Sequence, residues 1–312
     1  MPRIIFLVGP TAIGKTEIAV LLAKKLKAEI VSADSMQIYK GMDIITSKPP
    51  VALRKKVPHH LISVILPFCE YNVSQYRYAA ARQIKGIIKR KKIPLLVGGT
   101  GLYMSILVDG IFEIKTEKPR LRNRLYHEAE RYGGSFLHSK LKKVDPSAAD
   151  KIHPNDTRRL VRALEVFNAT GKPISELQKQ RKGLSDEYEV EILALNMARD
   201  ELYKRIDARV EQMFAQGLVQ EVRKLLKTRL SKTASYAIGI RELKGFFDGL
   251  YDLEEAKRLM KRNTRQYAKR QLTWFRKDKR IKWINLGPKE RPQQIANLIF
   301  NKINGKSTVS NH

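Results

Sequence analysis

The sequence predicts an α/β fold in which a parallel β-sheet is flanked by helices and a mainly helical segment is inserted. Short apolar runs alternate with amphipathic stretches over roughly the first hundred residues. A glycine-rich motif joins the first apolar run to the helix that follows it. After residue 113 the chain changes to charged sequence with helical periodicity. With 312 residues, it is long enough to form two compact units.

The first half of the sheet is predicted from apolar runs bounded by turn residues. Residues 3–8 end at Gly9 and predict a fully buried strand, and residues 15–27 have the apolar spacing of a helix. Three further runs have the composition of strands: 29–34, 61–65 and 93–99. The amphipathic stretch 74–92 lies between the last two and predicts the crossover helix of a right-handed strand–helix–strand unit.

The second half of the chain begins with the insertion. Residues 116–182 read as charged helices with few strand signals. The composition returns to that of a strand at 188–197, where we expect the chain to re-enter the sheet. The other expected elements are helices at 199–228 and 253–278, a strand at 282–286 and a frayed polar tail from 304.

Charge is the most unusual property of the chain. Sixty-one Lys and Arg against 31 Asp and Glu give a net charge of +30 and an isoelectric point near 10.2. Such a surplus favours a polyanionic partner, although a basic surface can also serve solubility alone. Residues 254–282 contain twelve Lys and Arg, three acids, and the aromatics Tyr267, Trp274 and Phe275. This mixture suits unpaired RNA, while core packing is the favoured interpretation of Trp274 and Phe275.

Several classes of protein are excluded by the residues present. Cys69 is the single cysteine, so an intramolecular disulfide and a cysteine-rich zinc site are ruled out. The pair His59 and His60 lacks the spacing of a metal site and is interpreted as loop or surface. No apolar run approaches the roughly 20 residues that span a bilayer, and the N-terminus leads directly into the first strand. We therefore expect a cytoplasmic monomer with no membrane partner.

The strongest single motif lies between the first apolar run and the first helix. The residues that fit G-x-x-x-x-G-K-[ST] in full are Gly9, Pro10, Thr11, Ala12, Ile13, Gly14, Lys15 and Thr16. In such a loop the backbone N–H groups and the helix dipole bind an anion, the Lys contacts phosphates and the Thr hydroxyl can hold Mg²⁺. The motif predicts a P-loop NTPase-like sheet and a diphosphate or triphosphate ligand. Neither 61–65 nor 93–99 ends in the acidic residue of a Walker B strand, and this argues against an ATPase.

Asp34 stands at the end of the second apolar run. In an open α/β sheet this position lies at the carboxyl edge, beside the phosphate site. The carboxylate could act there as a general base. Together with Ser35 it could equally cap a turn or a helix. Position alone leaves both interpretations open.

Six segments, in order along the chain, resemble the tRNA dimethylallyltransferase family. They read GPTAIGKT, SADSMQIYKGMDI, LLVGGTGLY, HPNDTRRLVRALEVF, AIGIREL and KRQLTWFRKD, and the resemblance runs from about residue 4 to 280. It implies transfer of a dimethylallyl group from dimethylallyl diphosphate to the exocyclic N6 of the adenine 3′ of the anticodon, with release of diphosphate. The P-loop would then hold the diphosphate, with Mg²⁺ on Thr16.

The resemblance also implies roles for single residues. Asp34 is the base that takes the amine proton, Lys15 and Thr100 lie at the reacting centre, and Arg122 contacts the diphosphate substrate. The residues that match tRNA-contacting positions of the family are Asp34, Ser35, Met36, Gln37, Thr100, Arg122, Arg158, Arg159, Leu160, Val161, Arg162, Tyr236, Ala237, Ile238, Gly239, Ile240, Arg241, Lys269, Arg270, Gln271, Leu272, Thr273, Trp274, Phe275 and Arg276.

The expected organisation follows from this resemblance. Residues 1–115 and 183–312 form the catalytic core, and the insertion 116–182 grips the anticodon stem-loop. One position departs from the family pattern, since Ile45 stands where the family often has Gly. This leaves the path of the loop after Asp43 open.

Three other functions are weighed against tRNA prenylation. An isopentenyltransferase acting on free adenine nucleotides would share the P-loop and Asp34, but it needs no long basic C-terminal half. A small-molecule P-loop kinase would use ATP, which an assay with labelled ATP would detect. A non-enzymatic RNA-binding protein is disfavoured because Lys15, Thr16 and Asp34 are all present.

Overall fold

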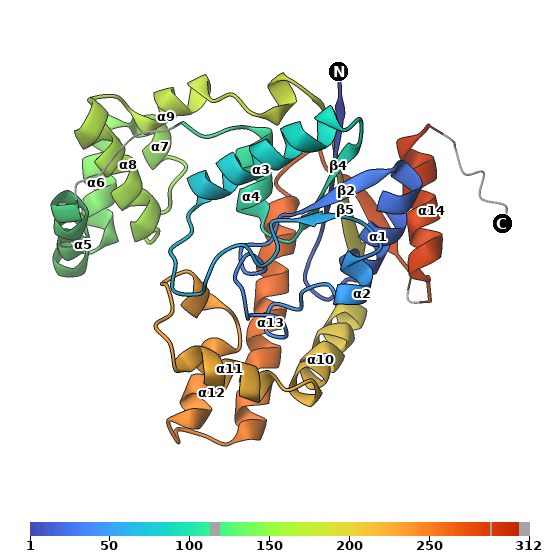
Figure 1. The fold of residues 1–312 in the computed structure, drawn as a ribbon. Helices are drawn as coiled ribbons and strands as arrows, with labels where there is room; N and C mark the ends of the chain where they lie inside the picture. Colours follow the sequence, from blue (N-terminus) through green and yellow to red (C-terminus); the bar gives the residue numbers. More distant parts are fainter. Residues whose placement is uncertain (113–118, 288, 306–312) are drawn as a thin grey trace. The chain divides into compact units, whose positions relative to one another are not determined.

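The computed structural model describes residues 1–112, 119–287 and 289–305 (Figure 1). The chain divides into two compact units, and unit 1 contains residues 1–108 and 184–312. Unit 2 contains residues 109–183, within which the expected insertion of 116–182 falls. The first residues of that expected insertion, up to 118, lie outside the described residues.

Unit 1 is built on one parallel sheet of six strands, which confirms the expected fold class. The strands are β1 (Arg3–Val8), β2 (Ala28–Ser32), β3 (His59–His60), β4 (Ile93–Gly98), β5 (Glu189–Met197) and β6 (Lys282–Leu286). Their order in the sheet is β3-β2-β4-β1-β5-β6. The apolar strand β1 therefore lies in the middle, between β4 and β5, where both of its faces are covered.

Two hydrophobic cores cover the two faces of this sheet. The helices of unit 1 are α1 (Lys15–Leu26), α2 (Val51–Arg54), α3 (Val73–Lys89), α4 (Gly101–Val108), α10 (Arg199–Ala215), α11 (Leu218–Leu226), α12 (Ile240–Phe247), α13 (Leu253–Phe275) and α14 (Pro292–Ile303). Ile5 and Leu7 of β1 pack in the core formed with α1 and α14, which lie side by side (Figure 1). Ile4 and Phe6 point to the opposite face, in the core that includes α3 and α4.

The parallel arrangement brings the strand ends together at one edge of the sheet. β1 pairs with β4 so that Val8 lies beside Gly98, and β2 pairs with β4 so that Ser32 lies beside Val97. The segments that leave these three strands, which begin at Gly9, Ala33 and Gly99, therefore emerge close together. In an open α/β sheet this carboxyl edge is where ligands bind.

Within its described residues, unit 2 contains helices joined by turns and no strand. Its elements are α5 (Pro119–Tyr132), α6 (Gly134–Val144), α7 (Pro146–Ala149), α8 (Thr157–Thr170), α9 (Ile174–Leu177) and a short 3₁₀ turn (Gln178–Gln180). Leu137, Leu141, Leu160 and Leu164 are buried in a core of its own. Unit 2 thus has the apolar interior that a separate domain requires.

Two expected elements differ from the structure. Residues 61–65 are not a strand, because Leu61 and Ser63 have positive φ values of 61° and 54°, which extended backbone does not adopt. The edge strand is instead the half-buried pair His59–His60, so the loop interpretation of these histidines is wrong. The expected helix 199–228 is two helices, α10 and α11, separated at Gly217, where φ is +96°.

Candidate active site

The P-loop wraps around the start of α1. Gly9, Ala12 and Gly14 have positive φ values of 149°, 65° and 95°, which turn the chain sharply between β1 and α1. Gly14 is the N-cap of α1 and supplies no side-chain hydrogen bond. The first N–H groups of α1 and its dipole are therefore available to an anion.

Lys15 is the half-buried cation of this loop. Its Nζ donates hydrogen bonds to the carbonyl oxygens of Gly9 at 2.8 Å and Pro10 at 2.6 Å. Burial, and secondarily the positive charge of Arg209, lower the pKa of Lys15 to about 7, against the opposing effect of the Asp34 carboxylate. Lys15 and Asp34 are thus close enough for their charges to interact.

A cavity of about 810 Å³ opens over the P-loop. Its size is within the range of small-molecule and cofactor sites. The candidate residues from the sequence that line it are Thr11, Ala12, Gly14, Lys15, Thr16, Asp34, Gln37 and Gln271. The phosphate loop and the candidate base therefore line the same cavity, although they come from different strand–helix connections.

Asp34 accepts hydrogen bonds in the turn after β2 and also lines the cavity. Its Oδ1 accepts hydrogen bonds from the N–H groups of Met36 at 2.9 Å and Gln37 at 3.4 Å, which is a turn of the Asx type. Asp34 also lines the cavity. The N–H of Ser35 donates to Oγ1 of Thr100 at 3.2 Å, so the turn after β2 is tied to the turn after β4.

Gln271 of α13 braces the P-loop. Its Oε1 accepts a hydrogen bond from the N–H of Thr11 at 2.9 Å, and its Nε2 donates to the carbonyl oxygen of Gly99 at 2.8 Å. The side chain is buried. Tyr267, one turn earlier on α13, lines the same cavity, and burial followed by the charge of Asp34 raises its pKa. The helix α13 thus positions the two turns that carry the candidate residues.

Arg209 of α10 is a cavity residue that the sequence motifs did not identify. Its Nη1 donates to Oγ1 of Thr11 at 3.2 Å, and its Nε donates to Oγ of Ser47 at 2.8 Å. Burial lowers the pKa of this guanidinium. Arg205, one turn earlier, lines the cavity as well. The four-residue spacing of Arg205 and Arg209 places both on one helix face and could have suggested a shared site. No local sequence motif identifies either residue as part of the phosphate site.

The candidate residues in unit 2 form a group of their own. Arg122 of α5 makes a two-point ion pair with Glu165 of α8, at 2.6 and 3.0 Å. On α8, Arg158 and Arg159 are exposed, and Arg162 lies 3.6 Å from Glu165. Leu160 and Val161 are buried in the core of unit 2, so their side chains hold the helix in place rather than face a ligand.

The two C-terminal stretches of candidate tRNA contacts meet at a second hollow. A depression of about 250 Å³ is lined by Tyr236, Arg241 and Arg270 among others. Of the two adjacent aromatics on α13, Phe275 is fully buried, as expected. Trp274 is 37% exposed, so the core interpretation is wrong for that residue.

The chain is similar to known transferases over nearly its whole length. A family model described as IPP transferase matches residues 37–278, and one described as isopentenyl transferase matches residues 2–56. A tRNA dimethylallyltransferase of Halothermothrix orenii is 47% identical over 91% of this chain and 87% of its own length. One of Bacillus subtilis is 44% identical over 97% of both chains.

Solved structures show the same similarity. The full-length tRNA isopentenylpyrophosphate transferase of Bacillus halodurans is 39% identical, with a TM-score of 0.73, over 98% of this chain and 97% of that one. A eukaryotic dimethylallyltransferase acting on tRNA is 28% identical, with a TM-score of 0.81, over 99% of this chain and 81% of that one. The similarity therefore extends over both units.

Proposed function

The chain belongs to the IPP transferase family, and from that premise we propose that its cavity binds dimethylallyl diphosphate and an adenine of tRNA. The protein is a prenyltransferase that modifies tRNA. The acceptor is the exocyclic N6 of the adenine 3′ of the anticodon. The observation that carries the proposal is that the P-loop and the Asp34 carboxylate line one cavity at the carboxyl edge of the sheet.

The diphosphate is held by the residues of the P-loop. The N–H groups of 9–16 and the start of α1 provide donors and a positive dipole. Lys15 and Arg209 both line the cavity and add positive charge to it. These groups stabilise the negative charge that develops on the diphosphate as it leaves. Stabilisation of such charge is usually the largest contribution to lowering the activation barrier.

The donor set of the cavity fits Mg²⁺. Thr16 and Asp34 offer hard oxygen atoms in the cavity, and within the described residues no three His, Cys, Asp or Glu side chains gather as a metal cage. Mg²⁺ is commonly bound through one or two protein oxygens, water and substrate phosphates. The Thr16 hydroxyl would hold the ion, which would supply further neutralisation of the diphosphate charge.

The transfer exchanges one bond for another. The C1–O bond of dimethylallyl diphosphate breaks, its electron pair stays on the diphosphate, and the lone pair of adenine N6 forms the new bond to C1. The amine nitrogen then carries an extra proton, which Asp34 accepts. An adenine stacked in an RNA loop must leave the stack to reach the cavity, as bases do in other base-modifying enzymes.

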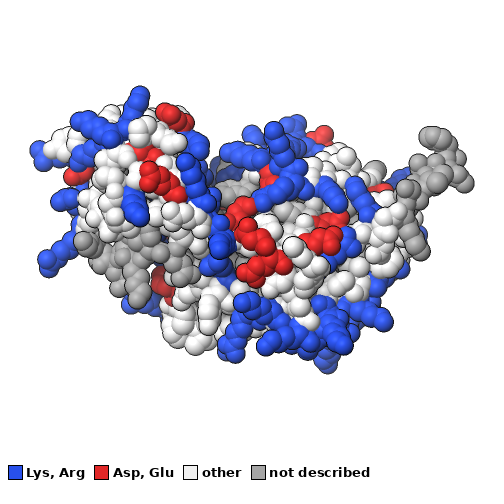
Figure 2. All heavy atoms as spheres, turned by 90° about the horizontal axis from the view of Figure 1, so that it is seen from above, with Lys and Arg blue, Asp and Glu red and all other residues white. Residues whose placement is uncertain are grey.

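The surface charge supports an RNA partner. Figure 2 shows Lys and Arg spread over the visible face, with acidic side chains confined to a few clusters. The net charge of +30 favours a polyanion, and we propose that the exposed cations Arg158, Arg159, Arg241 and Arg270 contact tRNA phosphates. Across residues 1–112, 119–287 and 289–305, every helix is too short or too polar to cross a bilayer.

A direct product assay tests the proposal. Purified protein is incubated with unmodified tRNA, dimethylallyl diphosphate and Mg²⁺, and the digested nucleosides are analysed by mass spectrometry. We expect dimethylallyl-adenosine from one site, and none from a tRNA in which the adenine 3′ of the anticodon is replaced by guanine. Product from AMP but not from tRNA would support the free-nucleotide alternative instead. Phosphate transfer from labelled ATP would support a kinase.

A further inference from the structure

A six-residue loop, 43–48, is fixed from outside by a carboxylate distant in sequence. The Glu221 carboxylate of α11 accepts hydrogen bonds from the backbone N–H groups of Asp43 at 3.0 Å, Ile44 at 2.9 Å and Ile45 at 2.8 Å. These are the first donors of a turn that closes with Ser47 N–H to Ile44 O at 2.9 Å. Donors at the start of such a turn lack partners of their own. Glu221 therefore caps the 43–48 loop with charge-assisted bonds.

The inner side of the 43–48 loop faces the cavity. Ile44, Thr46, Ser47 and Lys48 are among the residues that line it. Ser47 Oγ accepts the hydrogen bond from Nε of Arg209 at 2.8 Å, and the same guanidinium donates to Thr11 of the P-loop at 3.2 Å. A continuous series of contacts thus leads from Glu221 through the loop to Arg209 and the phosphate site.

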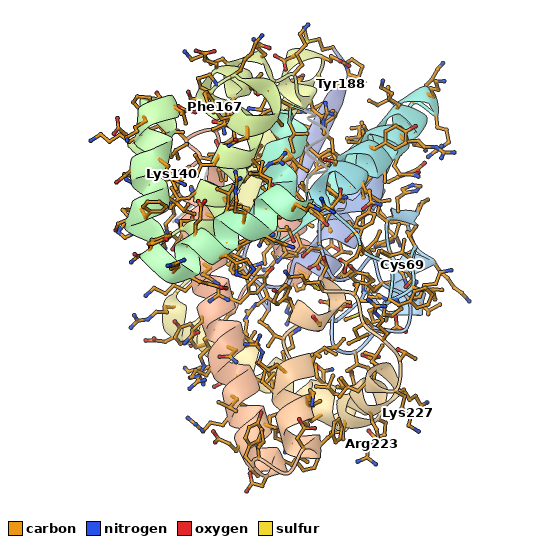
Figure 3. The ribbon with its side chains drawn as sticks, turned by 90° about the vertical axis from the view of Figure 1, so that its left-hand side faces the viewer. Cys69, Lys140, Phe167, Tyr188, Arg223 and Lys227 are labelled. Atoms are coloured by element: carbon orange, nitrogen blue, oxygen red, sulfur yellow. The ribbon has the colours of Figure 1, made fainter. Side chains whose placement is uncertain are left out.

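The helices α10 and α11 hold this loop at both ends. They are joined at Gly217, α10 carries Arg209, and α11 carries Glu221. Arg223 of α11 and Lys227, directly after its end, project outward (Figure 3). Glu221 lies two residues before Arg223, which is about 200° of rotation around a helix and turns it to the other side. Ser47 has a positive φ of 46°, a conformation that a non-glycine residue keeps only when its surroundings hold it.

We propose that Glu221 is a positioning residue for diphosphate binding, a role that rests on the proposed function. Its carboxylate fixes the 43–48 loop, the loop places the Ser47 hydroxyl, and that hydroxyl orients the Arg209 guanidinium toward the P-loop. Glu221 is absent from the residues that line the cavity, so we place its effect on the loop and not on the substrate itself. The orientation of Arg209 is its contribution to the reaction.

The test replaces Glu221 with glutamine in the variant E221Q. The new side chain is close in shape to the carboxylate but uncharged, and its amide N–H₂ would face backbone donors. We expect the KM for dimethylallyl diphosphate and the Kd for magnesium diphosphate to rise about tenfold, the effect of about 1.4 kcal/mol. We expect kcat to stay within about threefold, because the bound geometry is recovered at saturation. E221D, which keeps the charge on a shorter side chain, should recover part of the affinity.

A matched control and a double-mutant cycle separate positioning from general damage. E201Q removes a carboxylate of α10 whose ion-pair partner among the described residues is Lys204, and it should leave both constants unchanged. S47A removes the hydroxyl through which Glu221 acts. In the double variant E221Q/S47A the loss of affinity should equal that of S47A alone, rather than the sum of the two single losses.

The outcomes are distinguishable. Additive losses, or a Kd for magnesium diphosphate unchanged in E221Q, would overturn the positioning role. A fall in kcat and in melting temperature with the KM unchanged would mean that Glu221 serves folding alone. The wild-type protein is assayed in parallel, so a failure of the proposed function appears as absent product in every sample.

Discussion

At the scale of single residues, Asp34 has two roles, the structural role in the turn and the proposed role as base, which a conservative substitution can separate. D34N keeps an acceptor oxygen for the N–H groups of Met36 and Gln37 but removes the base. We expect kcat to fall at least about a hundredfold, the low end of general-base contributions, with tRNA affinity retained within about tenfold. Single-turnover kinetics and a filter-binding titration measure the two quantities.

D34A serves as the comparison, because alanine removes the turn acceptor as well. Any loss of tRNA affinity in D34A beyond that in D34N measures the contribution of the turn that the Asp34 side chain stabilises. An asparagine variant with wild-type turnover would remove Asp34 from the chemistry and leave it a structural residue.

Lys15 gives the site a pH dependence whose sign follows from its lowered pKa. Burial and Arg209 bring that pKa to about 7, so the free protein loses the Lys15 charge as pH rises above 7. Bound diphosphate favours the charged form and raises this pKa. We therefore expect the affinity for magnesium diphosphate to fall by up to about tenfold per pH unit above pH 7. Calorimetric titrations from pH 6 to 9 measure it.

The variant K15M supplies the control for this titration. Its affinity is lower at every pH, and the decline that belongs to Lys15 is missing. A wild-type affinity that stays level between pH 7 and 9 would show that Lys15 does not change charge in this range.

The sequence was sufficient for the residues of the site that lie in local motifs. The P-loop and Asp34 each follow a strand, so their place at the sheet edge could be predicted. Arg209 and Tyr267 could not, because they reach the cavity from helices remote in sequence. Gln271 was predicted as a tRNA contact by resemblance, whereas the structure shows its side chain bonded to Thr11 and Gly99.

At the scale of elements, close contacts at and just after the end of β4 account for the glycines at positions 98 and 101. A Cβ at Gly98 would collide with the backbone carbonyl of Ala33, and one at Gly101 would collide with the ring of Trp274. The first obstacle is the backbone of Ala33, directly after β2, which cannot move aside as the end of a flexible side chain could. The turns that carry Asp34 and Thr100 can approach each other only because this side chain is absent.

G98A is therefore expected to destabilise the protein. Overpacking of this kind costs about 1–3 kcal/mol, and here the obstacle is rigid. G86A is the matched control, since Gly86 lies within α3 and its Cβ would meet only the end of Arg90 at 3.5 Å. Alanine there should be neutral or stabilising by up to about 1 kcal/mol. Urea denaturation measures both, and an unchanged midpoint in G98A would contradict the packing argument.

The elements that the sequence predicted well are those with strong periodicity. β1, β4 and β5 are mainly apolar runs, and burial of both of their faces could be predicted from that composition. β3 has two residues and is paired only with β2, so no run of letters marks it. The apolar stretch at 61–65 was predicted as a strand because of its composition. Leu61 is indeed buried, but it belongs to an irregular turn.

At the scale of the whole molecule, unit 2 leaves and rejoins unit 1 at neighbouring points. The hydroxyl of Ser185 donates to the carbonyl oxygen of Val108 at 2.6 Å, where the chain crosses between the units. Each unit also has its own hydrophobic core. A short linker can therefore replace residues 109–183 without stretching the sheet of unit 1.

Excision of unit 2 tests the division of labour between the units. We expect unit 1, closed by a Gly-Ser linker, to unfold cooperatively. Because the excision also removes Arg122, a candidate diphosphate contact, its affinity for magnesium diphosphate should match that of the full-length variant R122A. We expect tRNA affinity to fall more than about tenfold, because the phosphate contacts made by α8 are lost. Each lost contact should also lower the slope of log affinity against log salt concentration by about 1. Calorimetry and filter binding across a range of salt concentrations measure these. If the shortened protein bound tRNA as tightly as the full chain, with the same salt slope, the basic helices of unit 1 alone would form the RNA surface and the arginines of α8 would have no part in it.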